Sequence, residues 1–333
     1  MNALAVMSEE THEDYCKKTL LRADFLAIER KALGLLGIIA FMTVALATCA
    51  EHPNLPEGER TLLGALRALG VSAEPAVWDS PDVNWAAFEA VVLRAAWDYH
   101  VKAAAFGGWL SRLEKAGVPL WNPAPVVRAN MNKSYLRGLE QAGATVVPTA
   151  WISAGRGRSL DEVLSERGWT QAVVKPVVSA SAYRTRRVAR GEPGAQAALE
   201  EVLAHSDAMV QPYLPEIEAE GEWSFIFLEG KFSHAVLKTP APGDFRVQSE
   251  HGGAAERRTP PPELRSQAER VAALGAPGLL YARVDGVRRG RELLLVELEL
   301  IEPYLYMDEA AGAAGRLARA IAARAANLRR LKT

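Results

Sequence analysis

The sequence has few of the residues that would build a disulfide framework or a zinc site. Among its 333 residues there are two cysteines, Cys16 and Cys49, which fits a reducing compartment. Net charge is also nearly absent, at -1, so nothing in the overall charge favours a nucleic acid or an acidic membrane as partner. With 49% hydrophobic and 24% charged residues, the chain is typical of a soluble protein of two or three domains. We expect it in the cytoplasm.

Long apolar runs are also rare, with one exception. From Ala32 to Ala50 no residue is charged, and the length suits a membrane span. The alternative divides the run into a helix that ends near Ala40 and a buried parallel strand in "TVALATCAE". We favour the second interpretation and expect no membrane partner.

The first 41 residues stand apart from the rest. Acidic residues precede the apolar run where a secretory signal would have basic ones. The regular pattern of strands and helices begins at Met42, so we expect residues 1–41 to be an extension outside the native fold. Translation is then expected to start at Met42.

After Met42 apolar segments alternate with helical ones, which predicts a parallel sheet covered by helices over residues 42–128. Ligands of such sheets bind beyond the carboxyl ends of the strands. Four residues follow the apolar "AVVL" and are candidate substrate contacts: Arg94, Trp97, Asp98 and Tyr99. The alternative is that the aromatic pair packs the loop and that Arg94 and Asp98 form an ion pair.

From residue 129 the pattern changes to hairpins with fewer helices, which indicates α+β structure. We expect one subdomain over 129–210 and a second over 211–333. Within the second, "VELELIEP" has a glutamate at every other position. In a strand Glu297 and Glu299 share one face, about 6 to 7 Å apart. Either this face is exposed to water or a cation lies between the two carboxylates.

A hairpin provides that cation and a third carboxylate. "YARVD" puts Arg283 and Asp285 on one face, and the turn "RRGR" returns the chain antiparallel to "LLVELEL". Asp285 joins Glu297 and Glu299 only if the numbers of directly paired residues add to an even value. This register requires a turn with an odd number of residues, and we predict one. Three carboxylates beside an arginine suit Mg²⁺ bound with a polyphosphate.

Lysines are expected to bind the phosphates from the side opposite the metal. Lys133 precedes a helix, whereas Lys175 and Lys238 lie within apolar strands, where an ammonium group requires an anion. Taken alone, each is better explained as a surface lysine. The linker "VQPYLPEIE" could present backbone groups to a purine, with Glu216 within reach of a ribose.

These motifs, in this order, resemble the ATP-grasp superfamily of carboxylate–amine ligases. The resemblance includes "VVKP", "QPYLPE", "GDFRVQ" with a following "GG", "ARVD" and "ELE". It implies two α+β subdomains that clamp ATP between antiparallel sheets. It also implies that Lys133 and Lys175 bind the adenine side and the α- and β-phosphates. It implies that adenine binds in a slot at Gln211, Pro212, Tyr213 and Leu214, and that Glu216 binds the ribose. Lys238 and Arg283 would bind the β- and γ-phosphates. Two Mg²⁺ ions, or Mn²⁺, would bind at Asp285, Glu297 and Glu299.

The sequence departs from the superfamily pattern in two places. The last metal ligand is usually Asn and here is Glu299, which adds a negative charge. The phosphate-covering loop is usually rich in glycine and here reads "VSASAYR", with Ser179 and Ser181 as phosphate contacts and Arg184 nearby.

Within the superfamily, "RAAWDYH", "GEWSFIF" and "ELELIEP" look like the branch that contains D-cycloserine synthetase, an O-ureido-D-serine cyclo-ligase. The resemblance implies a small amino-acid-like substrate that is activated as an acyl phosphate, with Asp244 and Arg246 as substrate contacts. Arg246 would also stabilise the acyl phosphate, and the loop from Pro240 to Gly253 would close over it. The alternatives are an ATP-grasp phosphotransferase and a non-catalytic ATP-binding protein. Homo-oligomerisation stays open.

Overall fold

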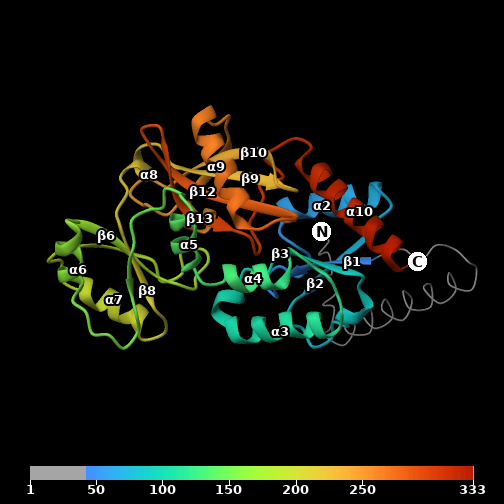
Figure 1. The fold of residues 1–333 in the computed structure, drawn as a ribbon, viewed down its shortest axis with the longest axis horizontal. Coiled ribbons are helices and arrows are strands. Elements are labelled where there is room, and N and C mark those ends of the chain that lie inside the picture. The colour runs from blue at the N-terminus through green and yellow to red at the C-terminus, as the bar shows by residue number, and fades with distance from the viewer. Residues whose placement is uncertain (1–42, 333) are drawn as a thin grey trace, which may run out of the picture. The chain divides into compact units, whose positions relative to one another are not determined.

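A computed structural model describes residues 43–332 of the chain, and three β-sheets organise these residues (Figure 1). The predictions for Cys16, for the helix before Ala40 and for the start at Met42 lie outside the described residues. No helix within residues 43–332 is long and apolar enough to cross a membrane. The second half of the apolar run forms strand β1 (Thr43–Thr48), buried at every position, as the strand interpretation predicted.

The first sheet is parallel, as the alternating pattern predicted, with the strand order β2-β1-β3-β4. Its other strands are β2 (Ser72–Val77), β3 (Ala90–Ala95) and β4 (Leu120–Trp121). Helices lie on both faces (Figure 1), with α2 (Glu57–Ala68) and the C-terminal α10 (Ala313–Lys332) in contact on one side. The opposite side has α3 (Ala103–Lys115) and α4 (Ala124–Asn130). Short 3₁₀ turns, Trp85–Ala87 and Tyr99–Lys102, flank β3.

The second sheet is antiparallel, with the order β5-β8-β6-β7. Its strands are β5 (Ala150–Ile152), β6 (Gln171–Pro176), β7 (Arg186–Ala189) and β8 (Ala208–Pro212). Helices α6 (Leu160–Arg167) and α7 (Ala195–Leu203) pack on one face through Leu164, Leu199 and other apolar side chains. The opposite face is thereby left for the cavity described below.

The third sheet is also antiparallel, with the order β11-β10-β9-β12-β13. Its strands are β9 (Glu222–Leu228), β10 (Lys231–Thr239), β11 (Ala254–Arg257), β12 (Tyr281–Arg289) and β13 (Glu292–Glu299). The remaining elements are α5 (Tyr135–Gln141), α8 (Glu216–Ala219), the 3₁₀ turn Ser249–His251 and α9 (Pro262–Gly275). The two antiparallel sheets, with the parallel sheet before them, confirm the ATP-grasp architecture that the resemblance implied.

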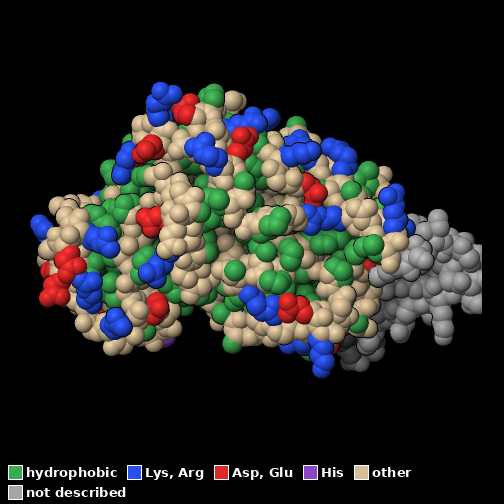
Figure 2. Space-filling view, in the orientation of Figure 1, with side chains coloured by type: hydrophobic (Ala, Val, Ile, Leu, Met, Phe, Trp, Pro, Cys, Tyr) green, Lys and Arg blue, Asp and Glu red, His purple; other side chains and the backbone are tan. Residues whose placement is uncertain are grey.

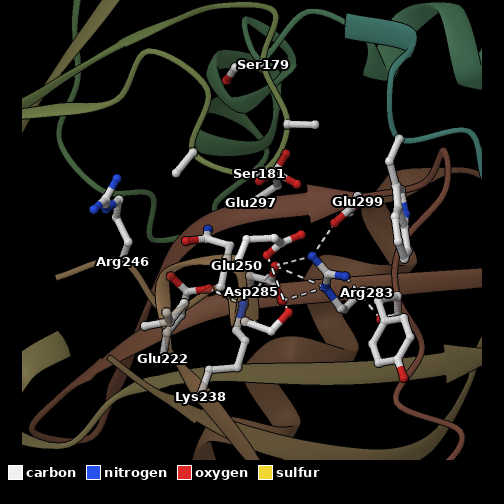
Figure 3. Close-up of a pocket in the computed structure, with 18 of the residues that line it drawn as sticks. Ser179, Ser181, Glu222, Lys238, Arg246, Glu250, Arg283, Asp285, Glu297 and Glu299 are labelled. Atoms are coloured by element: carbon white, nitrogen blue, oxygen red, sulfur yellow. Dashed lines mark hydrogen bonds and ion pairs between the residues drawn. The ribbon is translucent and has the colours of Figure 1, made fainter. Parts of the chain in front are cut away.

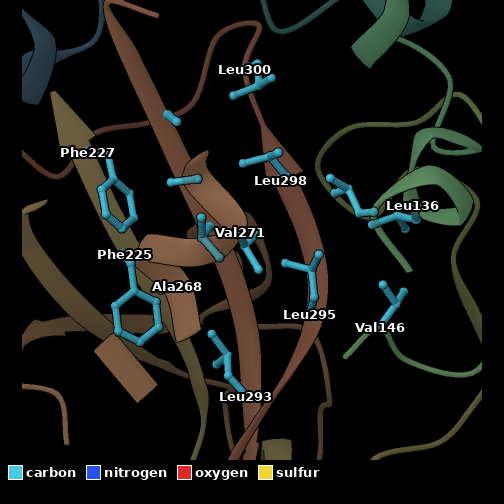
Figure 4. Close-up of a cluster of buried hydrophobic side chains, with 14 of the residues drawn as sticks. Leu136, Val146, Phe225, Phe227, Ala268, Val271, Leu293, Leu295, Leu298 and Leu300 are labelled. Atoms are coloured by element: carbon cyan, nitrogen blue, oxygen red, sulfur yellow. The ribbon is translucent and has the colours of Figure 1, made fainter. Parts of the chain in front are cut away.

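One apolar cluster joins α9, α5 and the third sheet (Figure 4). Leu295 and Leu298 of β13 meet Val271 of α9 and Leu136 of α5 in this cluster. Burial of apolar surface here fixes which face of β12 and β13 looks inward. The charged side chains on the other face are therefore presented to the cavity.

Charged side chains of both signs are interspersed over the face shown in Figure 2, with no broad field of one sign. This distribution agrees with the near-zero net charge.

Candidate active site

A cavity of about 1180 Å³ lies between the two antiparallel sheets and extends to the loops after β1 and β3. Pockets for one small ligand usually have about 300–1,000 Å³. The volume therefore suffices for a nucleotide together with a second small substrate. Most residues that the sequence singled out line it: Trp97, Asp98, Tyr99, Lys133, Lys175, Ser179, Ser181, Gln211, Pro212, Tyr213, Leu214, Lys238, Arg246, Arg283, Asp285, Glu297 and Glu299.

The three predicted metal ligands share one face of β12 and β13. Asp285 pairs directly with Glu297, and Arg283 pairs with Glu299, so the prediction of an even register is confirmed. The prediction of an odd turn is wrong, because only Gly290 and Arg291 separate the strands. A β-bulge between Asp285 and Gly286 instead shifts the strand pairing by one residue, which makes the register at Asp285 even.

Arg283 lies between two of these carboxylates (Figure 3). Its guanidinium donates to Asp285 at 2.9 Å and forms a close ion pair with Glu299. Burial alone would raise the pKa of Asp285, but Arg283 and Lys238 lower it to about 2. Burial raises the pKa of Glu299 to about 7, and the nearby charges of Glu297 and Asp285 add to that rise. The face therefore holds more negative charge than one arginine balances.

The three lysines have different partners. Lys133 is paired with Glu297, and Lys238 donates to Glu222 at 2.5 Å and lies 3.5 Å from Asp285. The Lys175 ammonium has no hydrogen bond or ion pair with any residue between 43 and 332. Burial, with repulsion from Lys133, lowers the pKa of Lys175 to about 8. A half-buried ammonium without a counter-ion is costly, which indicates that an anionic ligand completes this position.

Mg²⁺ fits the chemistry of the carboxylate face. Among residues 43–332 no three acidic, His or Cys side chains converge as a metal cluster. Each of Asp285, Glu297 and Glu299 is instead held by an arginine or a lysine. Carboxylate oxygens on one rigid strand pair are nevertheless the donors that Mg²⁺ prefers, and a phosphate ligand would compete for the cations that now hold them.

One end of the cavity is apolar. Val147, Val173, Leu214, Ile217 and Val296 line it, next to the linker that follows β8. The linker is fixed by a hydrogen bond from the Tyr213 N–H to the Gln171 carbonyl, and by the Gln211 amide, which donates to the Thr149 hydroxyl. This slot matches the flat apolar faces of a purine.

Glu216 does not take the predicted position next to a ribose. It is absent from the lining of the cavity, and Arg289 donates to its carboxylate at 2.6 Å. Arg289 also lowers the pKa of Glu216. The sequence pointed to Glu216 from its distance along the linker, but α8 begins there and turns the side chain towards β12.

Two loops cover the cavity. In the loop from Pro240 to Gly253, Arg246 lines the cavity but Asp244 does not, contrary to the prediction that Asp244 contacts substrate. Asp244 instead accepts hydrogen bonds from the Arg246 guanidinium, at 2.7 Å, and from two backbone N–H groups. These bonds lower the pKa of Asp244 and fix the position of Arg246.

The second loop, "VSASAYR", adopts the conformation that glycine usually provides. Ser181, Ala182 and Arg184 have φ of 47°, 54° and 51°. The left-handed region costs a non-glycine residue about 1–2 kcal/mol. The loop therefore reaches the glycine-rich geometry at the expense of strain, and both Ser179 and Ser181 face the cavity.

The structure places Arg94 away from the cavity, although it was predicted to contact substrate. Its side chain is completely buried and bound to Glu59 at 2.8 Å, and it does not line the cavity. The alternative pairing with Asp98 is also wrong, because Asp98 accepts from the Trp78 indole and from Lys102. Trp97, Asp98 and Tyr99 do reach the cavity, as predicted.

Several lining residues were missed by sequence reasoning. Glu222 pairs with Lys238 across the β9–β10 hairpin. The opposite charges at the two ends of this predicted hairpin could have indicated the pair. The loop after β13 contributes Glu302, Tyr304 and Tyr306. Glu302 lies within "VELELIEP", but no role was assigned to it, and neither tyrosine belongs to a motif that was singled out. They lie at the end of the cavity where the Arg283 guanidinium donates to the Tyr304 carbonyl at 3.1 Å.

Comparisons with known proteins agree with this geometry. Residues 44–122 match the family model for the N-terminal domain of D-cycloserine synthetase DcsG, and residues 140–303 match that for the ATP-grasp domain of prokaryotic glutathione synthetase. The cycloserine biosynthesis protein DcsG of Streptomyces lavendulae is 30% identical over 306 residues, which cover 87% of this chain and 99% of that protein. A glutathione synthetase of Parasynechococcus marenigrum is 31% identical over 52% of this chain and 54% of its own.

Solved structures extend the likeness. The crystal structure of D-cycloserine synthetase DcsG matches with a TM-score of 0.75 and 29% identity over 85% of this chain and 99% of that chain. A D-alanine–D-alanine ligase from Bacillus anthracis matches with a TM-score of 0.65 at 15% identity over 88% of this chain and 100% of its own, which supports the fold alone. The chain belongs to the ATP-grasp superfamily, in the family of D-cycloserine synthetase, and is an ATP-dependent carboxylate–amine ligase.

Proposed function

We propose that the protein uses ATP and Mg²⁺ to convert the carboxylate of a small amino-acid-like substrate into an acyl phosphate and then joins that carbonyl to an amine. One observation supports this most directly. A single cavity connects an apolar slot, three lysines and a face of three carboxylates. A nucleotide triphosphate has the matching sequence of an apolar base, an anionic chain and oxygens suited to a divalent cation.

In this proposal adenine occupies the slot next to Leu214 and Val296, and the phosphates extend towards the lysines. Lys175 gains the anion that it lacks, which restores its ordinary protonation. Lys133 and Lys238 exchange part of their contact with Glu297 and Glu222 for phosphate oxygens. Binding thus replaces one set of ion pairs by another and avoids an uncompensated charge in the cavity.

Asp285, Glu297 and Glu299 would hold Mg²⁺, which when bound neutralises charge on the β- and γ-phosphate oxygens. Arg283 keeps the three carboxylates in place from the side and can reach the transferred phosphoryl group. Charge stabilisation and positioning account for most of the catalysis of phosphoryl transfer, so no protein nucleophile is needed.

Two bonds form in sequence. The substrate carboxylate oxygen attacks the γ-phosphorus while the bond to the β-phosphate oxygen breaks, which releases ADP. The amine nitrogen then attacks the acyl carbon, and inorganic phosphate leaves with the amine proton. Arg246 stabilises the oxygens of the acyl phosphate, and the loop from Pro240 to Gly253 keeps water out.

The likeness to DcsG favours an amine within the same molecule, so that the product is a ring. We therefore propose O-ureido-D-serine as the substrate to test first, and a cytoplasmic location where ATP is supplied.

The deciding experiment measures ADP and phosphate release by the purified chain with Mg²⁺ and ATP, with and without O-ureido-D-serine. We expect substrate-dependent release together with cycloserine, which forms when the nitrogen that closes the ring also loses its carbamoyl group by hydrolysis to carbon dioxide and ammonia. Glu297→Gln should lower the rate by about 100-fold or more, because it weakens the charge that organises the γ-phosphate. Glu292→Gln is the matched control, since Glu292 is exposed at the other end of β13 and should leave the rate unchanged.

Other outcomes discriminate the alternatives. A phosphorylated product without amine addition would replace the ligase by a phosphotransferase. ATP binding without ADP release across a panel of amino acids would refute the catalytic proposal.

A further inference from the structure

Glu302 is a buried carboxyl group without a partner. Its residue is 2% exposed, its Oε2 accepts no hydrogen bond, and no residue between 43 and 332 forms an ion pair with it. It nevertheless lines the cavity. The backbone carbonyl of Glu302 accepts a hydrogen bond from the Trp97 indole at 3.1 Å, so the position of the residue is fixed. A buried polar group in this condition indicates a missing ligand.

Aromatic rings surround the same end of the cavity. The His52 and Trp97 rings lie 5.2 Å apart, and the Trp97 and Tyr304 rings 6.2 Å apart. All three residues line the cavity. Ring faces attract cations and stack poorly with anions.

The described segments outside residues 123–300 contribute only acidic charged side chains to the cavity. Six acidic residues and no Lys or Arg line the cavity among the described residues before residue 123 and after residue 300: Glu51, Glu57, Asp98, Glu302, Asp308 and Glu309. Arg283 reaches this end, where it donates to the Tyr304 carbonyl at 3.1 Å, but its guanidinium is already bound by Asp285 and Glu299. A substrate group that enters this acidic and aromatic end should therefore be positively charged.

We propose that Glu302 binds the ammonium group of the substrate, with the rings of Trp97 and Tyr304 beside it. This proposal rests on the proposed function, because it assigns the substrate whose carboxylate is activated. With its ammonium at Glu302, a small amino acid directs its carboxylate towards Arg283 and the phosphates. The site would thereby select small zwitterionic amino acids over α-hydroxy acids and over phosphorylated substrates.

The test compares O-ureido-D-serine with its α-hydroxy counterpart, which lacks the ammonium group. Binding of each is measured by titration calorimetry in the presence of Mg²⁺ and a non-hydrolysable ATP analogue. We expect the wild type to bind the amino compound about 10- to 100-fold more tightly, as for a charge-assisted hydrogen bond. Glu302→Gln should abolish most of this preference while the affinity for the ATP analogue stays unchanged.

Glu292→Gln is the matched control, since it removes one negative charge from an exposed position outside the cavity. It should retain the preference. An undiminished preference in Glu302→Gln, or no binding of the amino compound to the wild type, would overturn the proposal. Should Glu302→Gln fail to fold, Trp97→Leu provides a second variant, which should reduce the same preference by removing the ring.

Failure of this inference is distinguishable from failure of the proposed function. ADP release with O-ureido-D-serine depends on phosphoryl transfer, whereas the binding preference is measured without turnover. ADP release with an undiminished preference in Glu302→Gln would leave the ligase intact and reject the role of Glu302.

Discussion

Lys175 offers the sharpest test, because its effects on stability and on nucleotide binding should have opposite signs. A pKa of about 8 in place of 10.5 corresponds to about 3 kcal/mol against the charged form in the folded protein. Lys175 is half-buried, so solvent screening reduces this to about 1–3 kcal/mol. In Lys175→Met the ammonium is lost while the aliphatic stem is largely kept. The nucleotide-free variant should therefore be more stable than the wild type at pH 7.

The pH dependence follows from the sign of the shift. The folded pKa lies below the unfolded value, so the folded protein binds this proton more weakly than the unfolded chain. The free-energy cost of the charged Lys175 in the folded protein is fully present below about pH 8 and disappears as the pH rises towards 10.5. The stability difference between variant and wild type should shrink over that range.

Differential scanning calorimetry at pH 7 and pH 9.5 measures this difference. At pH 7 without nucleotide we expect the melting temperature of Lys175→Met to be higher by about 2–4 °C for each kcal/mol. Saturating Mg²⁺ and ATP should reverse the order, because ATP at 100 times its dissociation constant adds about 2.7 kcal/mol to the wild type alone. Lys231→Met, an exposed position outside the cavity, is the control and should show neither effect.

Two results would refute this reasoning. A lower melting temperature of nucleotide-free Lys175→Met at pH 7 would mean that the ammonium group is compensated in the folded protein. An unchanged ATP affinity would mean that Lys175 does not contact phosphate.

Further predictions concern the backbone and a buried histidine. Gly286→Ala would place a Cβ 2.6 Å from a leucine side-chain carbon and 2.9 Å from a backbone oxygen of β13, so urea unfolding should show a loss of about 1–3 kcal/mol. Gly64→Ala, in open space on α2, should gain about 0.5–1 kcal/mol. Ala182→Gly should raise the unfolding free energy by about 0.5–1 kcal/mol, because it relieves a φ of 54°; no gain would show that the loop is unstrained. Burial, with Arg316, lowers the pKa of His234 to about 4, so the wild type should lose up to about 3 kcal/mol as the pH falls from 6.5 towards 4. His234→Asn should flatten this decline in acid unfolding, and an unchanged decline would contradict the assignment.

Much of the fold could be predicted because the spacing of apolar residues and the local composition agree with the final structure. "TVALAT" and "AVVL" lack charge and became buried parallel strands. Lys175 stood in an apolar strand, and that conflict between side chain and surroundings correctly pointed to the cavity. Such local conflicts are where function is expected to override folding preference.

Two of the failures share a physical reason, which is that long-range partners decide where a charged side chain points. Arg94 follows an apolar strand near the cavity, yet Glu59 on α2 holds it inside the core. Glu216 lies on the correct linker, yet Arg289 from a distant hairpin binds it. Neither partner is close in sequence, so no local pattern could indicate it.

The two hairpins of the third sheet show how a local irregularity creates the site. Both β9–β10 and β12–β13 are joined by turns of two residues, and both contain one bulge. Had the register at the turn continued, Asp285 would face Val296, and Glu222 would face Leu237. The bulges shift the pairing by one residue, so that Asp285 meets Glu297 and Glu222 meets Lys238. Because one residue of slip moves a side chain to the other face of a sheet, these bulges determine whether the charges gather in the cavity.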